Sequence, residues 1–130
     1  MESVDHKLLF NSMPVPRFIV KPDEDGHYVI QEINARALEY FSRRREHIIG
    51  KPIVDFMDSE NARHFEQAFE VCMKQKVPVT IKALPSFPGG VRVYGFWINP
   101  ILDISGNAVL IDVMAQPDTA DDSILQRERY

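Results

Sequence analysis

Four histidines and one cysteine are the side chains best suited to hold a metal ion in this sequence. The histidines His6, His27, His47 and His64 are scattered, and no second cysteine accompanies Cys72. Zinc sites place such ligands a few residues apart, commonly with cysteine pairs. We therefore expect no metal site.

Asp112 and Tyr94 come closest to an acid–base pair, a carboxylate with a phenol. Asp112 lies between Ile111 and Val113 in an apolar run, and side chains alternate between the faces of a strand. If the β-branched neighbours face the core, Asp112 faces outward. The sequence has no nucleophile–base motif and no phosphate-binding glycine loop, so we expect no enzymatic activity from this domain.

Aromatic and apolar side chains recur on one face of a strand at 91–98 and along one stripe of a helix that begins near Ser59. If the two faces meet, they form either an apolar ligand pocket or ordinary core packing. Regular aromatic stripes are more often packing. The candidate ligand pocket consists of Phe65, Phe69, Cys72, Tyr94, Phe96 and Ile98.

Trp97 falls on the opposite face of that strand from Phe96. A large aromatic side chain on the outer face of a sheet needs a cover, either the amino-terminal helix or a second protomer. The helix predicted at 6–10 carries Leu8 and Leu9. We expect helix and dimer contacts together to cover Trp97, so Trp97, Leu8 and Leu9 are the candidate cap and dimer surface.

The first half of the chain predicts a hairpin followed by helices. Turn residues at 23–26 separate two apolar strands, and Asn34 has the side chain of a helix N-cap. Pro14 to Pro16 end the first helix, and Pro78 ends the last. The predicted elements are a helix at 6–10, strands at 17–20 and 28–33, and helices at 35–41, 54–57 and from about 59 to 77.

The second half changes its apolar period from 3.6 residues to 2, which predicts strands. Short turn-rich segments join these strands, so they should be antiparallel neighbours with the helices together on one face of the sheet. The predicted strands are 79–84, 91–98 and 108–115, with turns at 85–90 and 103–107.

Composition indicates one globular domain: 130 residues, 45% hydrophobic and 26% charged. A net charge of −4 argues against nucleic acid as a partner, and the run 43–45 of arginines is expected to be solvated helix surface. No apolar stretch is long enough to span a membrane, and the amino terminus does not resemble a signal peptide. We expect a cytoplasmic location, with which the single cysteine agrees.

Beyond Pro117 the sequence turns polar, and 124–130 shows a helical pattern that has no stop signal. This pattern is typical of a linker helix that leads into another domain. The predicted organisation is an amino-terminal helical cap at 1–16, a core at 17–117, and a carboxyl-terminal linker helix at 118–130 leading to an absent output domain.

The order of these elements, together with several short sequence words, resembles the PAS family from about Leu8 to Thr119. No single one of these short motifs is specific for the family, but their order and spacing are. The words are Gly26, Ile33-Asn34-Ala35 with Ala37, Ile48-Ile49-Gly50-Lys51, Phe56-Met57, Asn99-Pro100-Ile101, Asp103-Ile104-Ser105-Gly106 and Asp118-Thr119. The resemblance implies an α+β fold, a five-stranded antiparallel sheet with short helices and one longer helix packed on one face.

The same resemblance bears on cofactors. Haem-binding members carry their ligand histidine on the long helix, but counting from Phe56-Met57 places Phe65, not His64, at that position. Flavin-binding members carry a reactive cysteine in an Asn-Cys-Arg-Phe-Leu word, which is absent around Cys72. Haem and flavin are therefore disfavoured, and the identity of any ligand stays open.

The function implied by the resemblance is sensory. Such a domain binds a small ligand, dimerises, or does both, and relays a change to a carboxyl-terminal output domain, here expected to be a diguanylate cyclase or a histidine kinase. Asp118 and Thr119 would lie at the relay point. The alternative is a PAS domain that binds no ligand and serves only as a homodimerisation module.

Overall fold

The computed structural model describes residues 6–41, 43–82 and 93–117, and for 6, 7, 40, 82, 93, 94 and 117 it describes the backbone only. The predicted order of two strands, several helices and three strands is confirmed. The elements are α1 (His6–Ser12), β1 (Arg17–Pro22), β2 (Tyr28–Ile33), α2 (Ala35–Phe41), the 3₁₀ helices η1 (Arg45–His47) and η2 (Ile53–Phe56), α3 (Ser59–Gln75), β3 (Val79–Lys82), β4 (Val93–Leu102) and β5 (Ala108–Pro117).

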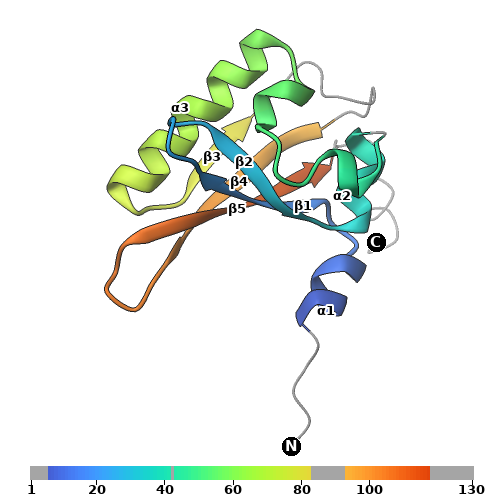
Figure 1. The fold of residues 1–130 in the computed structure, drawn as a ribbon, viewed down its shortest axis with the longest axis horizontal. Coiled ribbons are helices and arrows are strands. Elements are labelled where there is room, and N and C mark those ends of the chain that lie inside the picture. Colours follow the sequence, from blue (N-terminus) through green and yellow to red (C-terminus); the bar gives the residue numbers. More distant parts are fainter. Residues whose placement is uncertain (1–5, 42, 83–92, 118–130) are drawn as a thin grey trace, which may run out of the picture.

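The five strands form one sheet in the order β2-β1-β5-β4-β3, and every neighbouring pair is antiparallel. The amino-terminal hairpin therefore joins the last three strands through a β1–β5 pairing that brings the two ends of the domain together. Figure 1 shows α2 and α3 on one side of this sheet and α1 on the other. The predicted α+β fold is confirmed.

Two turns of the same construction close the hairpins β1–β2 and β4–β5. In each, the Oδ1 atom of an aspartate accepts the backbone N–H four residues later, at 2.8 Å for Asp23 and 2.9 Å for Asp103. The glycine three residues after the aspartate has a positive φ, 85° at Gly26 and 87° at Gly106, which L-residues adopt only with strain. Turn chemistry encoded in the sequence thus sets the register of both hairpins.

Helix α3 is the long helix that the apolar stripe predicted. It begins after Asp58, whose side chain accepts the N–H of Asn61 at 2.8 Å as an N-cap. It ends at Gln75, where Lys76 adopts a left-handed φ of 58° and closes the helix before Pro78 is reached. The stripe is confirmed by the burial of Ala62, Phe65, Phe69 and Cys72.

The core lies between the inner face of the sheet and helices α2, η2 and α3. Phe96 and Ile98 of β4 are buried there, with Ile111 and Val113 of β5, while Trp97 points to the outer face. The expected alternation of both strands is confirmed. Asp112 accordingly lies on the outer face.

Some boundaries differ from the prediction. Strand β4 continues past Ile98 through Pro100 to Leu102. Proline is tolerated there because β3 begins at Val79, opposite Ile98, so beyond Ile98 the strand β4 pairs with β5 alone. The sequence also did not predict η1, and the predicted turn at 85–90 lies outside the described residues.

Within the three described ranges, no helix has the length and apolar character needed to cross a membrane.

Candidate functional site

Five residues of the candidate ligand pocket come together on the inner face. The ring centroids of Phe65 and Phe96 are 4.8 Å apart, those of Phe65 and Phe69 are 5.7 Å apart, and Tyr28 adds a ring 4.9 Å from Phe69. The side chain of Tyr94 lies outside what the structure describes. None of the following exposes more than 1% of its surface: Phe65, Phe69, Cys72, Phe96 and Ile98.

Cys72 is held inside this cluster. Its Sγ lies 3.9 Å from the backbone oxygen of Ile98, a contact that joins α3 to β4. Burial raises the pKa of the Cys72 thiol to about 11. The side chain is therefore a neutral thiol at physiological pH and behaves as a small apolar group.

The histidines that the structure describes do not form a cluster that could bind a metal ion. The imidazoles of His27, His47 and His64 are all exposed, and His64 lies off the buried stripe of α3. Among the residues that the structure describes, no three of His, Cys, Asp and Glu are grouped so as to hold a metal ion.

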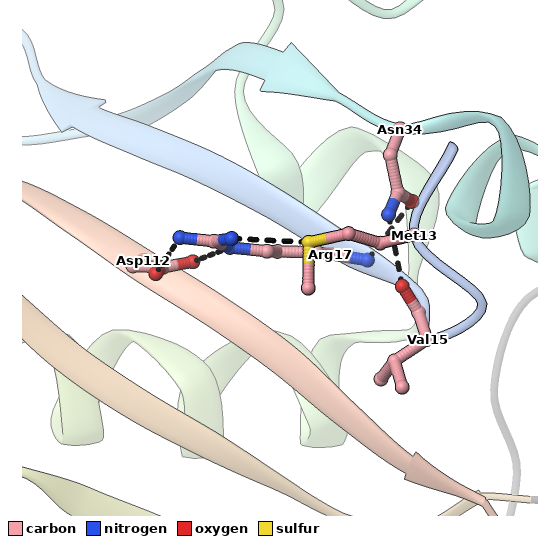
Figure 2. Close-up of polar contacts among 5 residues, drawn as sticks. All are labelled: Met13, Val15, Arg17, Asn34 and Asp112. Atoms are coloured by element: carbon pink, nitrogen blue, oxygen red, sulfur yellow. Dashed lines mark hydrogen bonds and ion pairs between the residues drawn. The ribbon is translucent and has the colours of Figure 1, made fainter. Parts of the chain in front are cut away.

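A buried asparagine, Asn34, clamps the start of β1 to the start of α2, and Figure 2 shows its bonds to Arg17 and Val15. Asn34 is fully buried, and its Oδ1 accepts the N–H of Arg17 at 3.0 Å and of Ala37 at 2.9 Å. Its Nδ2 donates to the oxygen of Val15 at 2.8 Å. The predicted N-cap is confirmed, and the same side chain also fixes the path of the chain from α1 into the sheet.

Arg17 and Asp112 form a two-pronged ion pair on the outer face (Figure 2). Arg17 Nε donates to Asp112 Oδ1 at 2.8 Å, and Nη2 donates to Oδ2 at 2.6 Å. Arg17 pairs with Met114 and Asp112 with Ile19 in the β1–β5 register, so the two charged residues are diagonal neighbours. The hydrogen bond to Asp112 raises the pKa of Arg17, so the guanidinium is charged throughout the physiological range.

Two arginines, Arg17 of β1 and Arg45 of η1, also contact α1 or the residue after its end. Arg17 Cζ lies 5.3 Å from the centroid of the Phe10 ring, and its Nη1 lies 3.2 Å from the sulfur of Met13. Arg45 donates to Asn11 Oδ1 at 3.0 Å, to Glu32 at 2.9 Å and to the oxygen of Ile33. Between α1 and strands β1 and β2 lies an open hollow of about 1140 Å³.

The candidate cap and dimer surface divides into two places on the outer face. Leu8 and Leu9 lie on α1 beside β1 and β2. Trp97 lies on β4, on the far side of β5, where it is opposite Met114 and Thr80 and 40% exposed. The cover that was expected for Trp97 from α1 and a second protomer stays a prediction.

Other expectations fall outside the described residues. Asp118 and Thr119, the candidate relay residues, directly follow β5, and 118–130 was the predicted linker helix. Sequence reasoning also missed Tyr28 in the aromatic cluster and the polar set of Arg17, Arg45 and Glu32. The one sequence signal for the Arg17–Asp112 ion pair was a charged residue at an outward-facing position in each of two strands.

A sequence model described as the PAS fold matches residues 10–120. No curated protein is similar enough to count as a match.

Solved structures share the fold at low identity. The PAS domain of BvgS from Bordetella pertussis is 16% identical over 94% of this chain and 90% of that chain, with a TM-score of 0.69. A sensory box sensor histidine kinase from Vibrio cholerae is 18% identical over 85% of each chain, with a TM-score of 0.64. The Vibrio cholerae VqmA dimer gives a TM-score of 0.74 at 19% identity, over 96% of this chain but 56% of that chain.

Proposed function

Because this chain belongs to the PAS family, we propose that it is a sensory or regulatory input domain that self-associates and relays a change to an output domain. The observation that carries the proposal is the outer face of the sheet. Trp97 is 40% exposed on that face, beside Met114, and an exposed aromatic side chain of this size is unusual on a solvated sheet face. Enzymatic activity of the domain itself is not part of the proposal.

Self-association through this face makes a testable prediction. Replacing Trp97 with alanine removes the largest apolar side chain of the face, and aromatic anchors of this kind contribute about 2 kcal/mol or more at interfaces. We expect Trp97→Ala to weaken the dimer roughly 30-fold, measured by sedimentation over a range of concentrations. The monomer fold should persist because Trp97 lies outside the core.

The matched control is Val71→Ala. Val71 is also 40% exposed but lies on α3, on the other side of the sheet, so its loss should leave the dimer unchanged. An identical sedimentation profile for the wild type and the folded Trp97→Ala variant would contradict the proposed interface.

A small apolar ligand on the inner face is the second candidate function. It is favoured by the aromatic cluster of Phe65, Phe69 and Phe96, where the predicted pocket residues converge. VqmA, a structural neighbour, is described as bound to DPO, which supports small-molecule binding by analogy of fold. Haem and flavin stay disfavoured, so we expect the purified protein to be colourless.

Native mass spectrometry together with thermal shifts against a metabolite panel tests the ligand. A bound mass, or a compound that stabilises the domain, supports sensing. Ligand-free spectra without any shift, combined with a dimer, favour the alternative of a module that only dimerises.

The proposed relay runs from β5 into the segment that begins with Asp118 and Thr119. The proposed outputs are a histidine kinase or a diguanylate cyclase, and the neighbour that is a sensor histidine kinase supports the first. The division into a cap at 1–16, a core at 17–117 and a linker at 118–130 belongs to the same proposal.

A further inference from the structure

Helix α1 depends on its contacts for its existence. It has seven residues, and isolated helices shorter than about 12 residues are marginal in water. Its leucines contribute little burial to the described chain, since Leu8 is 63% and Leu9 54% exposed. Two arginines, Arg17 of β1 and Arg45 of η1, contact α1 and the residue after its end through their guanidinium groups.

Arg17 contacts both ends of the domain at once. Its guanidinium lies over the Phe10 ring, its Nη1 faces the Met13 sulfur, and its Nε and Nη2 donate to Asp112 of β5. The Arg17 side chain is 27% exposed and that of Asp112 is 14% exposed, so water screens this pair less than a surface pair. The other cation, Arg45, contacts β2 and not β5.

The carboxylate determines where the guanidinium plane lies. Two parallel N–H···O bonds fix that plane, whereas a single bond would leave it free to rotate. The contacts to the Phe10 ring and the Met13 sulfur both require the guanidinium to stay in place, because stacking and N–H donation are directional. Arg17 can therefore hold α1 in place only while Asp112 holds the guanidinium of Arg17.

We propose that Arg17 is a latch that couples docking and folding of α1 to the state of strand β5 through Asp112. A movement of β5 that separates the carboxylate from Arg17 releases and melts α1. By thermodynamic reciprocity, release of α1 perturbs β5 near Asp112. The latch needs neither a ligand nor a dimer, and it connects the amino-terminal helix to the strand that ends at Pro117.

The test is NMR of the isotope-labelled domain, with the ¹³Cα shifts of residues 8–12 as the measure of helix in α1. In the wild type these shifts should be helical. In two variants these shifts should move most of the way to coil values, while the other signals keep the dispersion of a folded protein. The variants are Asp112→Ala and Arg17→Lys, and the second keeps the positive charge but loses the two parallel N–H donors of the guanidinium. Helical shifts retained in either folded variant would overturn the latch.

Two variants on α1 complete the design. Phe10→Ala should shift the amide signals of Asp112 and Met114, as coupling between α1 and β5 requires. Asn11→Ala is the matched control: it removes the Arg45 contact, leaves Arg17 in place, and should leave those amide signals unchanged. If Asp112→Ala does not fold, Phe10→Ala decides, and unmoved β5 amides in that variant would overturn the proposal.

Discussion

Replacing Phe65 with alanine should lower the free energy of unfolding by about 4 kcal/mol. Phe65 is fully buried on α3 and contacts the rings of Phe69, on the same helix, and Phe96 of β4. Truncation removes the transfer free energy of the ring and leaves a cavity that close-packed neighbours fill only in part. A loss of this size is expected because Phe65 packs against the rings of Phe69 and Phe96, at the place where a ligand pocket was also predicted.

The same substitution separates packing from a pocket. If Phe65 bordered a ligand-sized cavity in the wild type, its ring would have fewer contacts to lose and the loss would be well below that of a packed core residue. Urea unfolding at one fixed protein concentration measures the difference, because self-association would otherwise add to stability. A loss under about 1.5 kcal/mol, the range of volume-conserving swaps, would favour the pocket.

Two control variants share the helix. Phe65→Leu keeps most of the volume and should lose about 1 kcal/mol. Arg63→Ala changes an exposed position two residues away and should stay within about 0.5 kcal/mol of the wild type. In the Phe65→Ala protein, benzene should restore part of the stability, as small apolar molecules do in engineered apolar cavities.

Local patterns in the sequence were enough to predict most of the fold. The stripe from Ala62 to Cys72 repeats every three to four residues and so identified the buried face of α3. The turn aspartates Asp23 and Asp103, each followed by a glycine three residues later, marked both hairpins. Alternation around Phe96 and Ile98 identified the inner face of β4, because neighbouring residues of a strand face opposite ways.

The polar contacts of the outer face were beyond such patterns. Arg17 and Asp112 are 95 positions apart, and they meet only because β1 lies between β2 and β5 in the sheet. A charge that faces outward is ordinarily solvated, so nothing local marks either residue as half of a pair. The second role of Asn34 was hidden for the same reason, since Val15 becomes its partner only after the chain turns into β1.

Replacing Asn34 with alanine should lower the free energy of unfolding by about 3 kcal/mol, or the melting temperature by roughly 10 °C. The side chain is fully buried and makes three hydrogen bonds, two accepted from Arg17 and Ala37 and one donated to Val15. Alanine leaves three backbone groups without their partner at a site shielded from water. Each such group costs about 1 kcal/mol, and the loss at Ala37 is also the loss of a helix N-cap.

Two further variants divide this effect between its causes. Asn34→Ser retains an N-cap for α2 but is too short to bridge to Val15, so it should lose an intermediate amount. Asn107→Ala changes an exposed asparagine in the β4–β5 turn and should stay within about 0.5 kcal/mol of the wild type. If Asn34→Ala unfolds at the same urea concentration as Asn107→Ala, the clamp between β1 and α2 contributes nothing to stability. If instead Asn34→Ser is as unstable as Asn34→Ala, the link to Val15 and Arg17 outweighs the cap, and the main role of Asn34 is to fix how the amino-terminal segment enters the sheet.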